Sequence, residues 1–87
     1  HESVVEEAVD GGHAGAQFNV AGLYFEGLGV AQDDVRAHMW FTLSALAGYS
    51  GAAKNRNSLA TRMSAAQIAL AQQKASDCQR AHFKGCD

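Results

Sequence analysis

The stretch GLGVAQDD, residues 27–34, decides how this 87-residue chain folds. Gly27 and Gly29 allow the positive φ angles of a tight turn, and Val30 is an apolar residue placed to enter a core. Asp33 or Asp34 is placed to cap a following helix, because an aspartate side chain accepts a hydrogen bond from a free N–H of the first helical turn. The stretch therefore predicts a connector between two helices.

Outward from this connector, helical periodicity extends over most of the chain. Five helical segments are expected, over residues 3–10, 14–26, 34–47, 50–62 and 64–82. The segment over 14–26 carries apolar residues on two faces, which indicates a helix packed between neighbours. Ser64 and Gln67 have the spacing of a capping box at the start of the last segment. Ser3 and Glu6 have the same spacing at the start of the first.

The composition favours an all-α fold, because proline is absent and alanine, the best helix former, dominates the apolar residues. The formal net charge of −2, with acidic and basic residues mixed, gives no basic surface for nucleic acid. No apolar run approaches the roughly 20 residues that cross a bilayer. We therefore expect a protein or peptide partner, with no nucleic acid, no membrane span and no cofactor.

Pairs of small residues eight positions apart recur along the chain, as Ala8/Ala16, Ala45/Ala53 and Cys78/Cys86. They are separated by roughly 35 residues, the period of a stacked helical hairpin. Small side chains where one hairpin ends and the next begins let consecutive hairpins approach closely. The spacing predicts an α/α right-handed superhelix (solenoid) of about two helical hairpins plus a leading half-unit; the alternative is an irregular helical bundle.

The connector and its surroundings resemble the Sel-one-like repeat (SLR) family, a relative of the tetratricopeptide repeat. The residues that carry the resemblance are Ala8, Gly11 or Gly12, Ala16, Tyr24, Gly27, Gly29, Val30, Asp33, Ala37, Trp40, Ala45 and Gly48. The chain departs from the family pattern at Val20-Ala21, where Leu-Gly is usual, and at Ala31, where Pro is common. The resemblance implies a non-enzymatic module for protein–protein interaction.

The repeat pattern divides the chain into one SLR domain of three parts: a half-unit helix over 1–11, a full repeat over 12–48 and a degenerate capping repeat over 49–87. Residues 54–87 resemble the segment that closes arrays of this family. An array end needs a polar outer face, which the segments Lys54–Asn57 and Gln72–Lys74 supply.

Cys78 and Cys86 are expected to form a disulfide, because they occupy the same frame as the alanine pairs and Gly85 allows the chain to turn back. Two alternatives stay open: two buried free thiols, or a metal site in which His82 completes a C-x3-H-x3-C pattern. Cysteine-rich secreted members of the family carry the same C-x7-C spacing. This resemblance implies an oxidising compartment, periplasmic or secreted.

No catalytic motif is present. Ser50 and Lys54 are one residue too far apart for the S-x-x-K pattern of penicillin-binding enzymes, and His13 has no evident acid or nucleophile partner. Tyr24 and Trp40 are expected in the core. The candidate binding residues are Phe18, Phe25, His38 and Phe41, with His38 expected on a helix surface.

The sequence thus predicts a module that buries a few aromatic anchors against a partner. Two alternatives belong to other classes of protein. One is a small secreted hydrolase or penicillin-binding protein of the cysteine-rich SLR type. The other is a self-associating structural repeat, which would form a homodimer through an exposed N-terminal stacking face near Val4 and Val5.

Overall fold

The computed structural model describes residues 13–86, and these residues form four α-helices without a strand. The helices are α2 (Ala14–Glu26), α3 (Asp34–Leu46), α4 (Ala52–Ala60) and α5 (Ala65–Arg80). The all-α prediction is confirmed, and each helix lies within or close to its expected range. The helix expected over 3–10, including Ser3, Glu6 and the Val4/Val5 face, lies outside the described residues.

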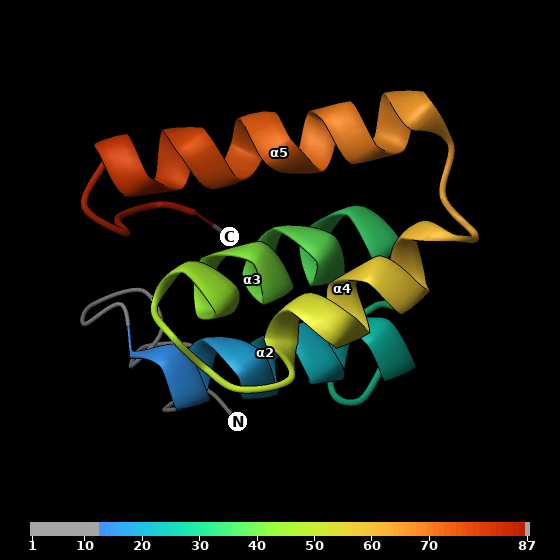
Figure 1. Cartoon of the computed structure of the whole chain (residues 1–87), viewed down its shortest axis with the longest axis horizontal. Helices are drawn as coiled ribbons and strands as arrows, with labels where there is room; N and C mark the ends of the chain where they lie inside the picture. Colours follow the sequence, from blue (N-terminus) through green and yellow to red (C-terminus); the bar gives the residue numbers. More distant parts are fainter. Residues whose placement is uncertain (1–12, 87) are drawn as a thin grey trace.

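Helix α3 is the centre of the molecule. It packs against α2, α4 and α5, and Figure 1 shows it between α2 on one side and α5 on the other, with α4 alongside. The residues that fill the core are Val20, Ala21, Tyr24, Ala37, Met39, Trp40, Leu43, Leu59, Ala71, Ala75 and Cys78. Helices α2 and α3 pack against each other as one hairpin, and α4 and α5, which follow in the chain, each pack against α3 rather than against each other. The right-handed sense and the domain boundaries stay predictions.

The connector 27–34 has the conformation that its residues predict. Gly27 adopts a φ of 71°, and the N–H groups of Gly27 and Leu28 both donate to the carbonyl oxygen of Leu23, which ends α2. Asp33 caps α3, because its carboxylate accepts a hydrogen bond from the Arg36 N–H at 3.1 Å. Val30 packs against the core. Local turn chemistry therefore fixes where α2 ends and where α3 begins.

The junction between α3 and α4 corrects the predicted small-residue pair. Ala53 is exposed and does not fill the junction as expected of the Ala45/Ala53 pair, and Ala52 is the fully buried alanine instead. The reason is that α4 begins at Ala52 with Gly51 as its N-cap, which turns the face of Ala52 and Leu59 inward. Ala8, the partner expected for Ala16, lies outside the described residues.

Helix α5 begins with the predicted capping box. Ser64 Oγ accepts from the Gln67 N–H at 3.1 Å, and the Ser64 N–H donates to Gln67 Oε1 at 2.9 Å. The helix ends at Arg80, earlier than expected, so His82 lies beyond it with a φ of 54°.

The chain then turns back, and Cys78 and Cys86 form a disulfide with their Cα atoms 5.1 Å apart. The predicted disulfide is confirmed. The metal and free-thiol alternatives are wrong, because each sulfur is bonded to the other and neither can act as a thiolate ligand.

Candidate functional site

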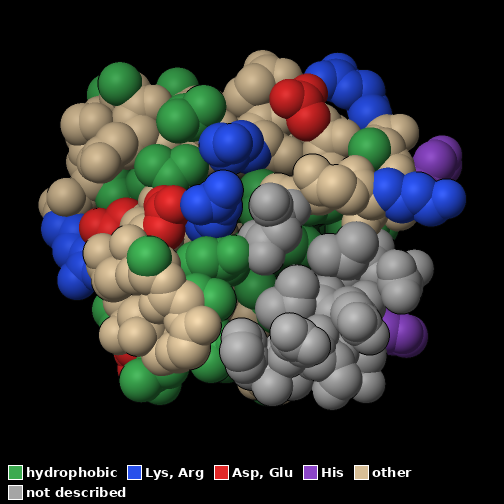
Figure 2. All heavy atoms as spheres, turned by 180° about the vertical axis from the view of Figure 1, so that it is seen from behind, with side chains coloured by type: hydrophobic (Ala, Val, Ile, Leu, Met, Phe, Trp, Pro, Cys, Tyr) green, Lys and Arg blue, Asp and Glu red, His purple; other side chains and the backbone are tan. Residues whose placement is uncertain are grey.

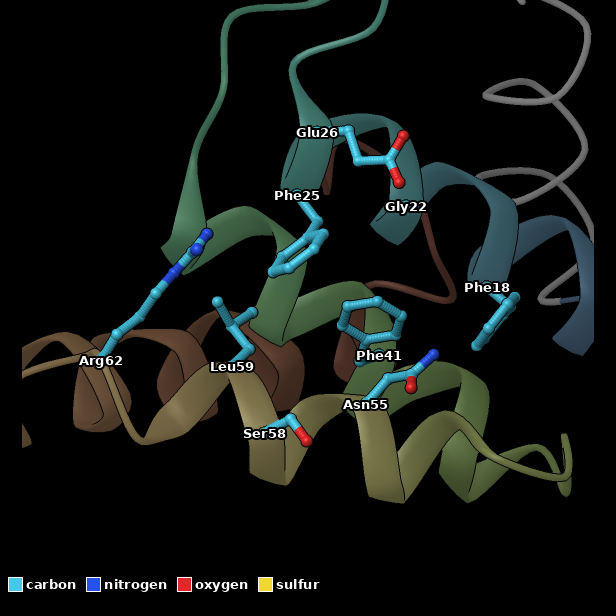
Figure 3. A pocket seen from close by; sticks show the side chains of 9 residues that line it. All are labelled: Phe18, Gly22, Phe25, Glu26, Phe41, Asn55, Ser58, Leu59 and Arg62. Carbon is cyan, nitrogen blue, oxygen red and sulfur yellow. The ribbon is translucent and has the colours of Figure 1, made fainter.

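A groove of about 330 Å³ runs between α2 and α4 and is open to solvent along its length. Figure 3 shows the side chains that line it: Phe18, Gly22, Phe25 and Glu26 from α2, Phe41 from α3, and Asn55, Ser58, Leu59 and Arg62 from α4 and the turn after it. The groove exists because α2 and α4 both pack against α3. Its lining is mostly apolar, with polar groups at the edges.

Stacked aromatic rings form one end of the groove. The ring of Phe18 stacks on that of Tyr49, with centroids 4.5 Å apart and planes inclined by 24°. It also meets the edge of Phe41, at a centroid distance of 5.5 Å and an angle of 64°. Phe41 is buried, whereas Tyr49 is 39% exposed. These contacts hold Phe18 in one orientation, so this part of the lining is already arranged before anything binds.

Gly22 opens the middle of the groove. It lies inside α2, where glycine costs roughly 1 kcal/mol relative to alanine. A Cβ built on Gly22 would have no atom within 4 Å, so close packing does not require glycine here. The missing side chain instead leaves a space between Phe18 and Phe25 on the same helix (Figure 3). Gly22 therefore lowers the stability of α2 but enlarges the groove.

An ion pair closes the opposite end. Arg62 donates two hydrogen bonds to the carboxylate of Asp34, of 3.1 and 2.7 Å, and its guanidinium lies 4.7 Å from the centre of the Phe25 ring. The hydrogen bond from Arg62 lowers the pKa of Asp34, and the same bond raises that of Arg62. Phe25 remains 37% exposed beside this pair. The side chain is thus held in place without being covered.

His38 does not belong to the groove, which corrects the prediction that placed it on a helix surface with the binding residues. Its side chain is buried on α3, with Nδ1 3.5 Å from the Thr42 Oγ1. Burial lowers the pKa of His38, and the nearby positive charge of Arg56 lowers it further. His38 is therefore a neutral core residue near pH 7. The other three candidates, Phe18, Phe25 and Phe41, line the same groove.

Within residues 13–86, no cluster of three or more His, Cys, Asp or Glu side chains is arranged to hold a metal ion. The same residues include no helix that is both long and apolar enough to cross a membrane. Figure 2 shows one face of the molecule, on which acidic and basic side chains lie next to one another and form no continuous basic area in the described part.

Comparison with known families explains the hairpin of α2 and α3. A family model, the Sel1 repeat, matches residues 14–49. These residues are a Sel1 repeat. The match covers α2, the connector and α3, and it ends at Tyr49. No curated protein and no solved structure is significantly similar to the chain.

The Sel1 repeat is a helical, solenoid-type repeat that generally mediates protein–protein interactions and is typically non-enzymatic. In this chain it contributes α2 and Phe41 to the groove, while α4, which follows the match, contributes the other side. Tyr24 and Trp40, two residues of the repeat pattern, are buried as expected. The candidate site is therefore formed between the Sel1 repeat and α4, which packs on α3 of that repeat.

Several residues of the groove were not predicted from the sequence. These are Gly22, Glu26, Asn55, Ser58, Leu59 and Arg62. Gly22 carried a usable signal, because an isolated glycine inside a helical pattern suggests a packing or functional reason. The side chains from α4 carried no such signal, since their approach to α2 depends on how α4 packs on α3.

Proposed function

We propose that the groove between α2 and α4 binds an apolar segment of a protein partner. The observation that carries the proposal is Gly22, which leaves open a space bordered by aromatic rings at the expense of helix stability. A purely structural helix would gain stability from alanine at this position. The general role of Sel1 repeats in protein interactions supports the same function.

Binding would rest on the burial of apolar side chains against rings that do not need to rearrange. Phe18 is fixed by Tyr49 and Phe41, and Phe25 by the guanidinium of Arg62. Preorganised surfaces of this kind lose less side-chain entropy on association, so more of the burial energy appears as affinity. Asn55 and Ser58 at the edge offer hydrogen-bonding groups to the backbone of the bound segment.

The test uses two glycine substitutions on one helix. A random-peptide display selection on the chain supplies ligands, and their affinities for two variants are then measured by calorimetry. Gly22→Leu fills the groove and should abolish binding while α2 stays folded, because leucine is a good helix former. Gly15→Ala is the matched control, since a Cβ there meets Tyr49 Cε1 at an ordinary 3.7 Å and lies outside the groove lining.

The selected peptides should bind wild type and Gly15→Ala alike and fail to bind Gly22→Leu. Equal binding to all three proteins would show that the groove is not the binding surface. Thermal unfolding of Gly22→Leu, monitored by circular dichroism, shows whether binding is lost only because the variant has unfolded. A variant that unfolds no earlier than wild type but does not bind supports the proposal.

The location of the protein is part of the same proposal. The Cys78–Cys86 disulfide is compatible with an oxidising compartment, and we infer that the chain acts in the periplasm or outside the cell. Alkylation of free thiols immediately on cell lysis tests this directly. Unmodified cysteines are expected, and alkylation of both cysteines in most molecules would place the protein in a reducing compartment.

A further inference from the structure

The two ends of the groove differ in charge. Phe18 of α2 and Asn55 of α4 lie toward one end, and Phe25 of α2 and Arg62, just after α4, lie toward the other (Figure 3). Helices α2 and α4 therefore run in the same direction along the groove. A helix carries partial positive charge at its N-terminus and partial negative charge at its C-terminus. The negative ends of α2 and α4 thus lie at the Phe25 end, and the N-terminus of α3 at the same end has its partial positive charge met by the carboxylates of Asp33 and Asp34.

The side chains add to this difference. Glu26 lies in the last turn of α2 and lines the groove, and none of the ion pairs found among the described residues involves it. Arg62 is the other charged residue of the lining, but its charge is balanced by the carboxylate of Asp34. Glu26 is exposed. The end at Phe25 therefore carries one carboxylate whose charge is not neutralised by a described side chain.

The aromatic lining favours a cation as well. The face of an aromatic ring attracts Lys and Arg side chains, and Arg62 makes such a contact with Phe25. At the other end the lining offers Asn55 and Ser58, which are uncharged, and no acidic group. An acidic side chain of a ligand would find the negative charge of Glu26 at one end of the groove and, among the lining residues, no cation to pair with at the other.

From this charge pattern we infer that the groove takes a basic-apolar segment of a partner protein, in which a Lys or Arg lies next to the apolar anchor. The anchor occupies the space over Gly22 and the cation lies at the Phe25 end, paired with Glu26. The charge difference gives the segment one direction along the groove. This inference rests on the proposed function, since it assigns a ligand chemistry to the same groove.

The first test compares display selections on wild type and on Glu26→Lys. Wild type should enrich peptides that have Lys or Arg within a few residues of an apolar side chain, and Glu26→Lys should lose this enrichment and favour Asp or Glu. Groove-binding peptides with the same charge preference for both proteins would overturn the inference and leave the proposed function standing. If no selected peptide is lost on Gly22→Leu, the proposed function itself fails.

The second test measures the affinity of one enriched peptide and of the same peptide with its cation replaced by Gln. Glu26→Gln should weaken the basic peptide about two- to five-fold, the range of an exposed ion pair, and leave the Gln peptide unchanged. The loss should disappear in high salt. Asp77→Asn, on α5 away from the groove, is the matched control and should change neither affinity. A Glu26→Gln effect equal for both peptides would contradict the ion pair.

Discussion

Arg62 and Asp34 are 28 residues apart in sequence, yet the guanidinium of one donates two hydrogen bonds to the carboxylate of the other. The pair joins the turn after α4 to the first residue of α3 and so ties α4 to the hairpin of α2 and α3. Because Arg62 also lies over Phe25, the same contact holds one end of the groove in shape.

Asp34→Asn should lower the unfolding temperature at pH 7 by a small amount that shrinks with added salt. The pKa of Asp34 is lowered in the folded protein, chiefly by the hydrogen bond from Arg62. Its contribution is therefore present above the unfolded-state pKa of about 3.9 and is lost as the pH falls through the lower folded-state value. Thermal unfolding of wild type and variant at pH 7 and near pH 2 tests this. An equal difference at both pH values would contradict the ion-pair explanation.

His38 should make stability pH-dependent in a different window. Its pKa is lowered by burial and, to a lesser extent, by Arg56, so protonation favours the unfolded chain. The contribution is fully present above the unfolded-state pKa of about 6.5 and is lost as the pH falls through the lowered folded-state value. We expect His38→Leu to flatten the dependence of the unfolding free energy between pH 7.5 and 5, measured by urea denaturation. A His38→Leu variant that keeps the wild-type slope would contradict this explanation.

Removing the disulfide should cost about 2–3 kcal/mol of unfolding free energy, because the bond closes a short loop between residues eight apart. The Cys78→Ala/Cys86→Ala double variant should also be cleaved faster by trypsin after the exposed Lys84, since the bond holds residues 81–86 against the end of α5 and lets Phe83 pack against the core. Urea denaturation and limited proteolysis measure the two effects. Wild type in excess reductant should match the variant; identical midpoints for oxidised and reduced wild type would refute the prediction.

Alanine should have opposite effects at two glycines of the first hairpin. Gly27 has a φ of 71°, and a Cβ there would lie 3.1 Å from the Cβ of Gln32, so Gly27→Ala should destabilise the protein by about 1–2 kcal/mol. Gly22 lies inside α2 with open space around it, so Gly22→Ala should stabilise by about 0.5–1 kcal/mol. Urea midpoints decide the signs. Destabilisation at Gly22 would show that its glycine is needed for packing.

Those parts of the fold that depend on local chemistry could be predicted from the sequence. The connector 27–34, the Asp33 cap and the Ser64/Gln67 capping box each involve residues close in sequence, and the structure has all three. The disulfide could be predicted because Cys78 and Cys86 have the same eight-residue spacing as the two alanine pairs. The prediction that Ala53 fills the junction was wrong because the inward face of α4 depends on the residue at which the helix begins. A shift of one position rotates every side chain around the helix axis.

The candidate site could be predicted only in part. Phe18, Phe25 and Phe41 lie together, but helical spacing alone could not separate a groove from a core, and His38 has the same kind of position on α3 yet is buried. Predicting the α4 side of the groove requires knowing how α4 packs on α3, which is set by contacts between residues distant in sequence. Charge at the groove edge became interpretable only when Arg62 was seen to be paired with Asp34.

The chain has one tryptophan, and it is fully buried on α3, against which the other helices of residues 13–86 pack. Trp40 belongs to one core cluster with residues of α2, α4 and α5, so its burial depends on the packing of these helices on α3. Its fluorescence emission should shift to longer wavelength only when water reaches the middle of the molecule. Comparing this emission with the loss of helix seen by circular dichroism therefore reports whether the helices separate from α3 in the same transition in which they unfold.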